Sequence, residues 1–209
     1  MKTVCVVGML LLTGMFGSAE AQMFQTVEPD QAQLLQTGPG KFYCPNCGMN
    51  LVKFYKTSHA VTQPDGPIHQ YCSLHCLVEA NPGSLAAARV VDTGTLNFIN
   101  TSDATYVVGS NKPGTMTMKS KYAFADQAAA EDFAAANGGE LVDFATAASI
   151  ARGTLAMENL KIDEKRSKMA VKGQKIFEGM CQEVEFPEFA SIAEAKIYLV
   201  ESDACGPLK

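Results

Sequence analysis

The feature that most constrains this chain is the spacing of its cysteines. Cys44 and Cys47 are separated by two residues, and Cys72 and Cys76 by three. Two short-spaced pairs supply the four ligands that a tetrahedral metal site needs. A disulfide within either pair would close a strained ring, so disulfides between the pairs are the covalent alternative.

The N-terminal segment indicates the compartment in which these thiols function. A cationic residue precedes an apolar run over residues 4–16, and small residues stand at 19 and 21. This pattern predicts a cleaved secretory signal peptide over residues 1–21, because the apolar run is shorter than the ~20 residues of a membrane span. Cys5 stands too early in the run to be acylated. We therefore expect a periplasmic protein without membrane attachment.

Removal of the signal peptide leaves six cysteines, an even number that fits an oxidising compartment. Cys181 and Cys205 stand at the end of one predicted helix and just after the next, and we expect them to form a disulfide. A chain of this length with 47% hydrophobic residues can bury a core without disulfides. The four clustered cysteines therefore need another explanation, and metal binding is the one we favour.

Charge and motif content exclude several classes of protein. The net charge is -5 and no basic stripe is present, so we expect no nucleic-acid partner. No Ser-His-Asp pattern, phosphate-binding glycine loop or pair of perturbed carboxylates is recognisable. We therefore do not expect an enzyme.

Turn residues and changes of composition divide the chain into segments. The five segments are a signal peptide (1–21), a flexible tether (22–40), a Cys-rich metal-binding half (41–95), a second half (96–152) and a helical extension with the Cys181 and Cys205 pair (153–209). Strands followed by a helix occur in both halves, which predicts an α+β fold with two similar halves.

The elements expected in the two halves are short. Strands are predicted at Lys53–Tyr55, Ala60–Thr62, Ile68–Tyr71, Ala88–Val91, Asn97–Asn100, Thr105–Val108, Lys121–Phe124 and Leu141–Phe144. Ser73 is expected to cap a helix running to Ala80, and Asp126 to cap a second helix at Gln127–Ala136. In the extension, a Lys/Glu-rich helix is expected after Gly153 and a second helix after Pro187.

A methionine beside the first cysteine pair changes the metal chemistry. Met49 follows Cys47 at i+2, so in an extended segment both side chains would leave the same face. Thiolate and thioether ligands together select Cu(I), and thioether is a poor ligand for zinc. Met116 and Met118 form a second sulfur-bearing segment, in which we expect Met118 to be a core or surface residue.

Histidines could complete such a ligand set. An imidazole with one free nitrogen binds copper or zinc, and His59 and His75 are better placed than His69 to do so. Three interpretations remain at this point: a Cu(I) site, a structural zinc site that forms an interaction module, and a thiol oxidoreductase. The oxidoreductase is the weakest, because Cys44 and Cys47 lack the strand-to-helix setting of a thioredoxin-like pair.

The motifs CPNCGM and YCSLHC resemble the YHS/TRASH class of metallochaperone motifs, and the segment from Thr105 to Phe144 is similar to the second half of the NosL family. That family comprises copper-binding accessory proteins for nitrous oxide reductase. The resemblance implies two ββα-type halves and Cu(I) binding and delivery outside the cytoplasm. It also places Cys47 and Met49 at the Cys-x-Met positions of the family, and Met116 at a characteristic methionine of the second half. The implied partner is a copper-receiving enzyme or its assembly factors, within the nitrous oxide reductase system.

The chain departs from the family pattern in two ways. Many members carry an acylated cysteine, which this chain lacks. It also has the fuller Cys72 and Cys76 pair and a helical extension, so a zinc-like or all-thiolate site could coexist with the Cys47 and Met49 site.

Overall fold

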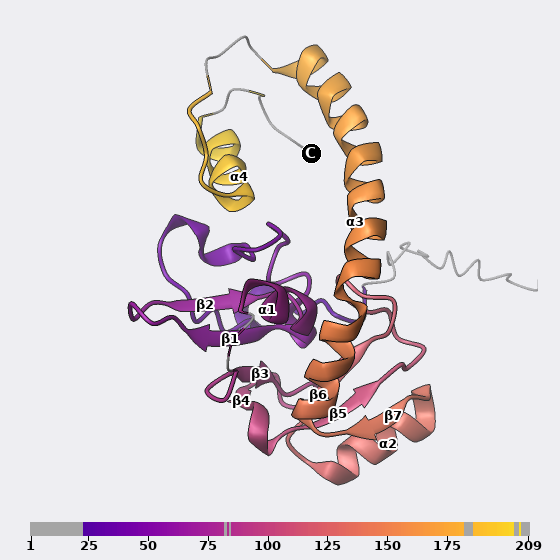
Figure 1. The fold of residues 1–209 in the computed structure, drawn as a ribbon. Coiled ribbons are helices and arrows are strands. Elements are labelled where there is room, and N and C mark those ends of the chain that lie inside the picture. The colour runs from indigo at the N-terminus through magenta and orange to yellow at the C-terminus, as the bar shows by residue number, and fades with distance from the viewer. Residues whose placement is uncertain (1–22, 82, 84, 182–185, 203–204, 206–209) are drawn as a thin grey trace, which may run out of the picture.

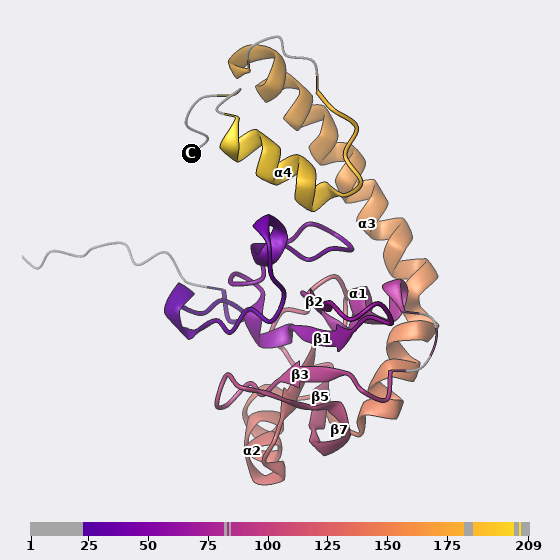
Figure 2. The same cartoon turned by 90° about the vertical axis from the view of Figure 1, so that its left-hand side faces the viewer.

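The computed structural model describes residues 23–81, 83, 85–181, 186–202 and 205. The predicted signal peptide at residues 1–21 lies outside this part of the chain. Helices and antiparallel sheets make up the described residues, which confirms the α+β class (Figure 1). One sheet lies above the other, and the helix α3 runs beside both (Figures 1 and 2).

The first sheet has four antiparallel strands in the order β2-β1-β3-β4, and it includes one strand, β4, from the segment predicted as the second half. Its strands are β1 (His59–Thr62), β2 (Ile68–Tyr71), β3 (Arg89–Val91) and β4 (Phe98–Asn100). The predicted cap at Ser73 begins helix α1 (Leu74–Ala80), and its hydroxyl oxygen accepts a hydrogen bond from the Cys76 N–H at 3.3 Å. The cap therefore brings Cys72 and Cys76 to either side of the first helical turn.

The second half forms a three-stranded antiparallel sheet in the order β6-β5-β7. Its strands are β5 (Thr105–Val108), β6 (Lys121–Phe124) and β7 (Glu140–Val142). Asp126 caps helix α2 (Gln127–Asn137), accepting from the Ala128 N–H at 3.0 Å. The orders β1-β2-α1 and β5-β6-α2 are the two ββα units that the resemblance implied.

The strand predicted at Lys53–Tyr55 is wrong. The Asn50 side-chain oxygen accepts from the backbone N–H groups of Val52 at 2.9 Å and Lys53 at 3.1 Å, which folds the chain into a turn. A short 3₁₀ helix, η3 (Tyr55–Thr57), follows. The other 3₁₀ helices are η1 (Pro29–Gln31), η2 (Pro39–Phe42) and η4 (Thr101–Asp103).

The segment expected as a flexible tether packs on both halves. Gln25 and Val27 are buried, and the Gln25 side-chain amide donates to the Pro113 carbonyl oxygen at 2.9 Å. The Leu35 N–H donates to the side-chain oxygen of Gln70 in β2 at 2.9 Å. Residues 23–40 therefore belong to the folded body, in contrast with the expectation.

Polar contacts and a shared core join the two sheets. The buried His59 ring in β1 has its Nε2 3.0 Å from the Tyr106 hydroxyl in β5. The buried Asp92 carboxylate, after β3, accepts from the Ala125 N–H at 3.1 Å, just after β6. One apolar cluster includes residues from both sheets, from α1 and from the start of α3. The halves consequently form one body.

Helix α3 (Phe144–Met180) begins nine residues before Gly153, although the helix was expected to start only after that glycine. The Asp143 carboxylate caps it by accepting from the Thr146 N–H at 2.8 Å. Ala147 and Ala151 are buried in the shared core, and their small side chains let α3 approach α1 closely. The end of the predicted strand Leu141–Phe144 is therefore wrong, because Phe144 already belongs to the helix.

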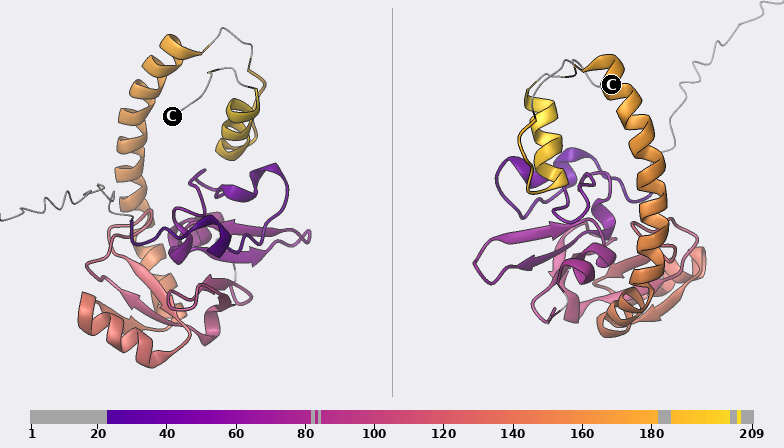
Figure 3. Two further views of the ribbon diagram at one scale, coloured as in Figure 1. Left: turned by 180° about the vertical axis from the view of Figure 1, so that it is seen from behind. Right: turned by 45° about the horizontal axis from the view of Figure 1, so that its top comes forward.

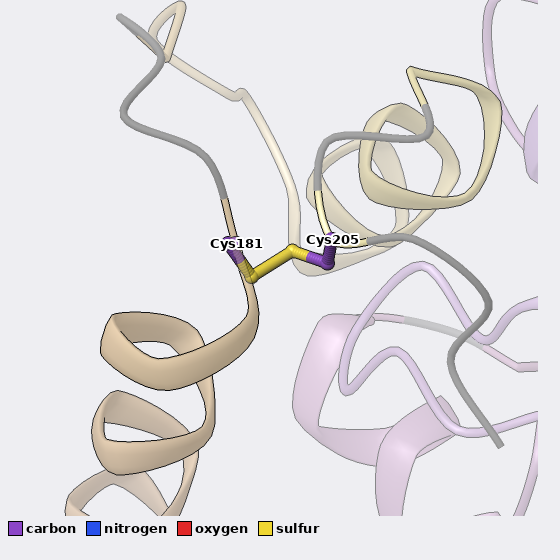
Figure 4. Close-up of a disulfide and its surroundings, with 2 residues drawn as sticks. All are labelled: Cys181 and Cys205. Carbon is purple, nitrogen blue, oxygen red and sulfur yellow. A yellow bond between two sulfur atoms is a disulfide. The ribbon is translucent and has the colours of Figure 1, made fainter.

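The outer part of α3 extends beyond the sheets. Helix α4 (Ile192–Glu201) follows it in the chain and lies against the Cys-rich half (Figure 3). The structure joins Cys181 and Cys205 in a disulfide that ties the end of α3 to the residues after α4 (Figure 4). The Lys196 ammonium donates to the Gly48 carbonyl oxygen at 2.5 Å. The extension thus contacts the loop that carries the first cysteine pair.

Candidate metal centre

Four cysteines converge between the first loop and α1. Cys44 and Cys47 lie in the loop closed by the Tyr43–Asn50 bridge, which we call the knuckle loop (residues 43–50). Cys72 follows β2, and Cys76 is in α1. All four thiols are buried, free of disulfides and within 4.8 Å of one another. We call this group the cysteine cluster.

Hydrogen bonds and a glycine shape the knuckle loop. The Gly48 N–H donates to the Cys44 carbonyl oxygen at 2.8 Å, and the Cys44 N–H donates to the Met49 carbonyl oxygen at 2.9 Å. Gly48 has φ +72°, a left-handed conformation that glycine adopts without steric cost. A Cβ at Gly48 would also lie only 2.5 Å from the Cγ2 of Ile192 in α4. The segment from Cys47 to Met49 is therefore a turn, and the extended geometry considered for it is wrong.

The spacing of the sulfur atoms suits a metal ion. Cys72 Sγ lies 3.4 Å from Cys47 Sγ and 3.7 Å from Cys76 Sγ. A tetrahedral ion with metal–sulfur bonds of about 2.3 Å holds its sulfur ligands roughly 3.8 Å apart. The cysteine cluster could therefore hold a four-coordinate ion with little movement, and a two- or three-coordinate ion through a subset of its thiols.

The thiols of the cysteine cluster differ in acidity. Burial would raise the pKa of Cys44, but hydrogen bonds from Cys47, Cys72 and Cys76 outweigh it and hold this pKa well below its ordinary value. The pKa values of Cys72 and Cys76 are raised well above the ordinary value, because both thiols hydrogen-bond to Cys44 and Cys47 and both are buried. One thiolate thus forms readily, and further ionisation requires a cation such as a metal ion to balance the charge.

A pocket of about 410 Å³ opens beside the cysteine cluster. It is lined by five sulfur-bearing residues, which are Cys47, Met49, Met116, Met118 and Met169. Cys47 is the one member of the cysteine cluster among the lining residues. We call this cavity the methionine pocket. Its α3 wall also carries the basic residues Lys161, Lys165 and Arg166.

The methionines differ in how they reach this pocket. Met49 and Met116 are partly buried against the shared core, whereas Met118 is 66% exposed and Met169 is 61% exposed. The exposure of Met118 agrees with the expectation of a surface residue, although it also lines the pocket. Met169 belongs to α3 and was not predicted, because nothing in the sequence indicates which face of a long polar helix turns toward a distant loop.

The structure does not bring the two favoured histidines to the sulfur atoms. Both ring nitrogens of His59 have partners at 3.0 Å, the Thr57 carbonyl oxygen and the Tyr106 hydroxyl, and burial lowers its pKa to about 4. His75 Nδ1 lies 3.1 Å from Glu158 Oε2, and its Nε2 lies 2.9 Å from Asn159 Oδ1. The expectation that His59 or His75 is a metal ligand is therefore wrong, because both nitrogens of each ring already have a partner.

The sequence that forms this site matches a known protein family. The NosL family model matches residues 40–149, more than half of the chain. The chain belongs to the NosL family. A similar solved structure is the crystal structure of the copper chaperone NosL from Shewanella denitrificans, with 25% identity, a TM-score of 0.42 and coverage of 56% of this chain and 95% of that one. No curated protein matches the chain.

The NosL-matching region contains the whole cysteine cluster together with Met49, Met116 and Met118. The α3 wall of the methionine pocket lies beyond it, since the match ends at residue 149 and the lining residues of α3 begin at Glu158. This NosL chain therefore combines sulfur-bearing residues from the family region with one pocket wall from its helical extension.

Proposed function

We propose that this NosL protein binds Cu(I) through cysteine and methionine sulfur and delivers it for the assembly of a metal centre. The observation that carries the proposal is the position of Cys47, which belongs to the buried cysteine cluster and also lines the methionine pocket. Cys47 therefore connects a protected set of thiols to a surface that a recipient can reach.

The donor set supports copper over harder metals. Thiolate and thioether ligands are soft and select Cu(I), and Met49 and Met116 bring thioethers to the pocket that Cys47 lines. No oxygen-rich cage is required for such an ion. The proposed binding residues are Cys47, Met49 and Met116, with the remaining thiols of the cysteine cluster as further ligands.

Delivery requires that an incoming ligand can reach the ion. The methionine pocket is open, so a ligand of the recipient could approach an ion held by Cys47 before that ion leaves. Neutral thioethers are weaker ligands than thiolates, which favours exchange. We propose no catalytic activity for the protein, because holding and releasing an ion need only this change of ligands.

The proposed recipient is nitrous oxide reductase or its assembly factors, in the periplasm. Support comes from NosL-family membership and from the secretory signal read in the sequence. None of the helices in the described part of the chain has the length and apolar character of a membrane span.

A structural zinc site is the second candidate, and one observation favours it. All four thiols of the cysteine cluster are buried and mutually close, as in closed tetrahedral sites that stabilise small domains. A thiol oxidoreductase is less well supported, because Cys44 and Cys47 lie in the knuckle loop and not at the strand-to-helix turn of a thioredoxin-like pair.

Metal competition tests the proposal against zinc. Mature protein, reduced and free of oxygen, is titrated with a Cu(I) chelator and separately with a Zn(II) chelator. We expect far tighter retention of Cu(I), and transfer of the ion from loaded protein to copper-depleted nitrous oxide reductase. Tighter retention of zinc, with unfolding when zinc is removed, would instead support the structural site.

A further inference from the structure

The backbone of Met116 is unusual for its residue type. Met116 has φ +58°, in the left-handed region that side chains other than glycine rarely adopt. Such conformations persist only where surrounding contacts hold them, and they concentrate at functional sites. The contacts on either side of Met116 are therefore informative.

On the C-terminal side, the contacts come from helix α3. Glu158 is 3% exposed, and its Oε1 accepts from the Thr117 hydroxyl at 2.5 Å and from the Met118 N–H at 3.1 Å. The second carboxylate oxygen faces His75 Nδ1 at 3.1 Å. One buried carboxylate thus joins the residues after Met116 to the helix that carries Cys76.

On the N-terminal side of Met116, the contacts come from the Cys-rich half. The buried Thr115 hydroxyl lies 2.8 Å from the Thr57 hydroxyl, which also lies 2.8 Å from the Cys72 carbonyl oxygen. Met116 is therefore held between two anchors, one beside Cys72 and one on α3. The Lys121 ammonium in β6, 3.0 Å from the Thr117 hydroxyl oxygen, adds a further contact on the C-terminal side of Met116.

We propose that Glu158 is a positioning residue that orients the Met116 thioether toward Cys47 and Met49, a role that rests on the proposed function of this pocket. Glu158 bonds to Thr117, Met118 and His75, and it acts on Met116 through Thr117 and Met118. Since the NosL match ends at residue 149, the helical extension supplies this support from outside the family region. Groups that orient ligands typically change metal affinity by 10–100-fold when they are removed.

The test is a double-mutant cycle on the full mature chain. Thr117→Val removes the hydroxyl that donates to Glu158 without disturbing His75, and Glu158→Ala removes the carboxylate itself. We expect each to weaken Cu(I) binding about tenfold when Met116 is present, and by less than about twofold when Met116 is replaced by leucine. Glu178→Ala, an exposed position on the same helix, should leave the affinity unchanged.

A second readout follows Met116 without copper. In metal-free protein with ¹³C-labelled methionine methyl groups, Thr117→Val should move the Met116 methyl resonance toward its random-coil position. An unmoved resonance, or an equal loss of Cu(I) affinity in the wild-type and Met116→Leu backgrounds, would overturn the inference while leaving the proposed function intact. A wild-type chain that binds no Cu(I) would overturn the proposed function and this inference with it.

Discussion

The cysteine cluster and the methionine pocket adjoin each other but differ in exposure and in ligand type. The four thiols are buried and close together, and they come from the knuckle loop, from the residue after β2 and from α1. The pocket is open, lined by thioethers from the knuckle loop, the Met116 loop and α3. A closed set of thiolates favours retention of an ion, and an open set of neutral ligands favours its exchange.

Cys47 is the residue at which these two environments meet. It is 8% exposed, whereas Cys44, Cys72 and Cys76 have no exposed surface. Substitutions in the closed group should therefore affect stability and metal content together. Substitutions in the open group should affect Cu(I) affinity with little change in stability.

The largest effect is expected for Cys72→Ser. Cys72 has sulfur neighbours at 3.4 and 3.7 Å, so its loss removes a ligand and buries a hydroxyl among the remaining thiols. An unsatisfied buried polar group costs about 1–3 kcal/mol, and the stabilisation by bound metal is lost in addition. Thermal unfolding and metal content should fall together in loaded protein. Cys72→Ala, which buries no hydroxyl, is the control, and full metal content in both variants would contradict a ligand role.

For Cys47→Ser we expect a large loss of Cu(I) affinity and a smaller loss of stability than for Cys72→Ser. This substitution removes the thiolate shared by the cysteine cluster and the pocket, and we expect Cu(I) affinity to fall by about 100-fold or more. The unfolding temperature of metal-free protein should change less than in Cys72→Ser, because Cys47 lies at the edge of the core. Chelator competition measures the affinity. Unchanged Cu(I) binding would show that the pocket and the cluster are not connected through this residue.

The smallest change in Cu(I) affinity is expected when the disulfide is removed. Replacing both Cys181 and Cys205 by serine should destabilise the extension by about 3 kcal/mol in the chain-entropy model, seen as faster hydrogen exchange in α4. Cu(I) affinity should change by no more than about threefold, since no ligand is lost. A large loss of affinity would mean that the contact between Lys196 and Gly48 holds the knuckle loop in its binding geometry.

Local sequence signals predicted much of the fold. The bounds of β5 and β6 are those expected, and the caps at Ser73 and Asp126 lie where capping chemistry placed them. The convergence of the four cysteines also followed from their spacing, because zinc-like knuckles recur with these separations. Signals of this kind operate over a few residues and need no knowledge of tertiary contacts.

The remaining features depend on contacts between distant segments. The early start of α3 had a readable signal, Asp143 before alanines at i+4 intervals, but the apolar run ending at Phe144 suggested a strand instead. Glu158 lies 41 residues from Thr117, and nothing in its Lys/Glu-rich surroundings distinguishes it from solvated glutamates. His75, placed between two cysteines in sequence, turns its ring toward α3. Sequence spacing cannot give that direction.

The most direct test of the account compares Met49→Leu with the wild type in one Cu(I) competition series, with Zn(II) affinity and thermal stability measured on the same samples. Leucine keeps the volume of Met49 and removes its sulfur atom, so the fold should be retained. The account predicts Cu(I) binding about tenfold weaker, with Zn(II) affinity and unfolding temperature unchanged. Met157→Leu, on an exposed part of α3 that does not line the pocket, is the control. Wild-type Cu(I) affinity in Met49→Leu would contradict the claim that thioether ligands distinguish this site from a structural zinc cluster.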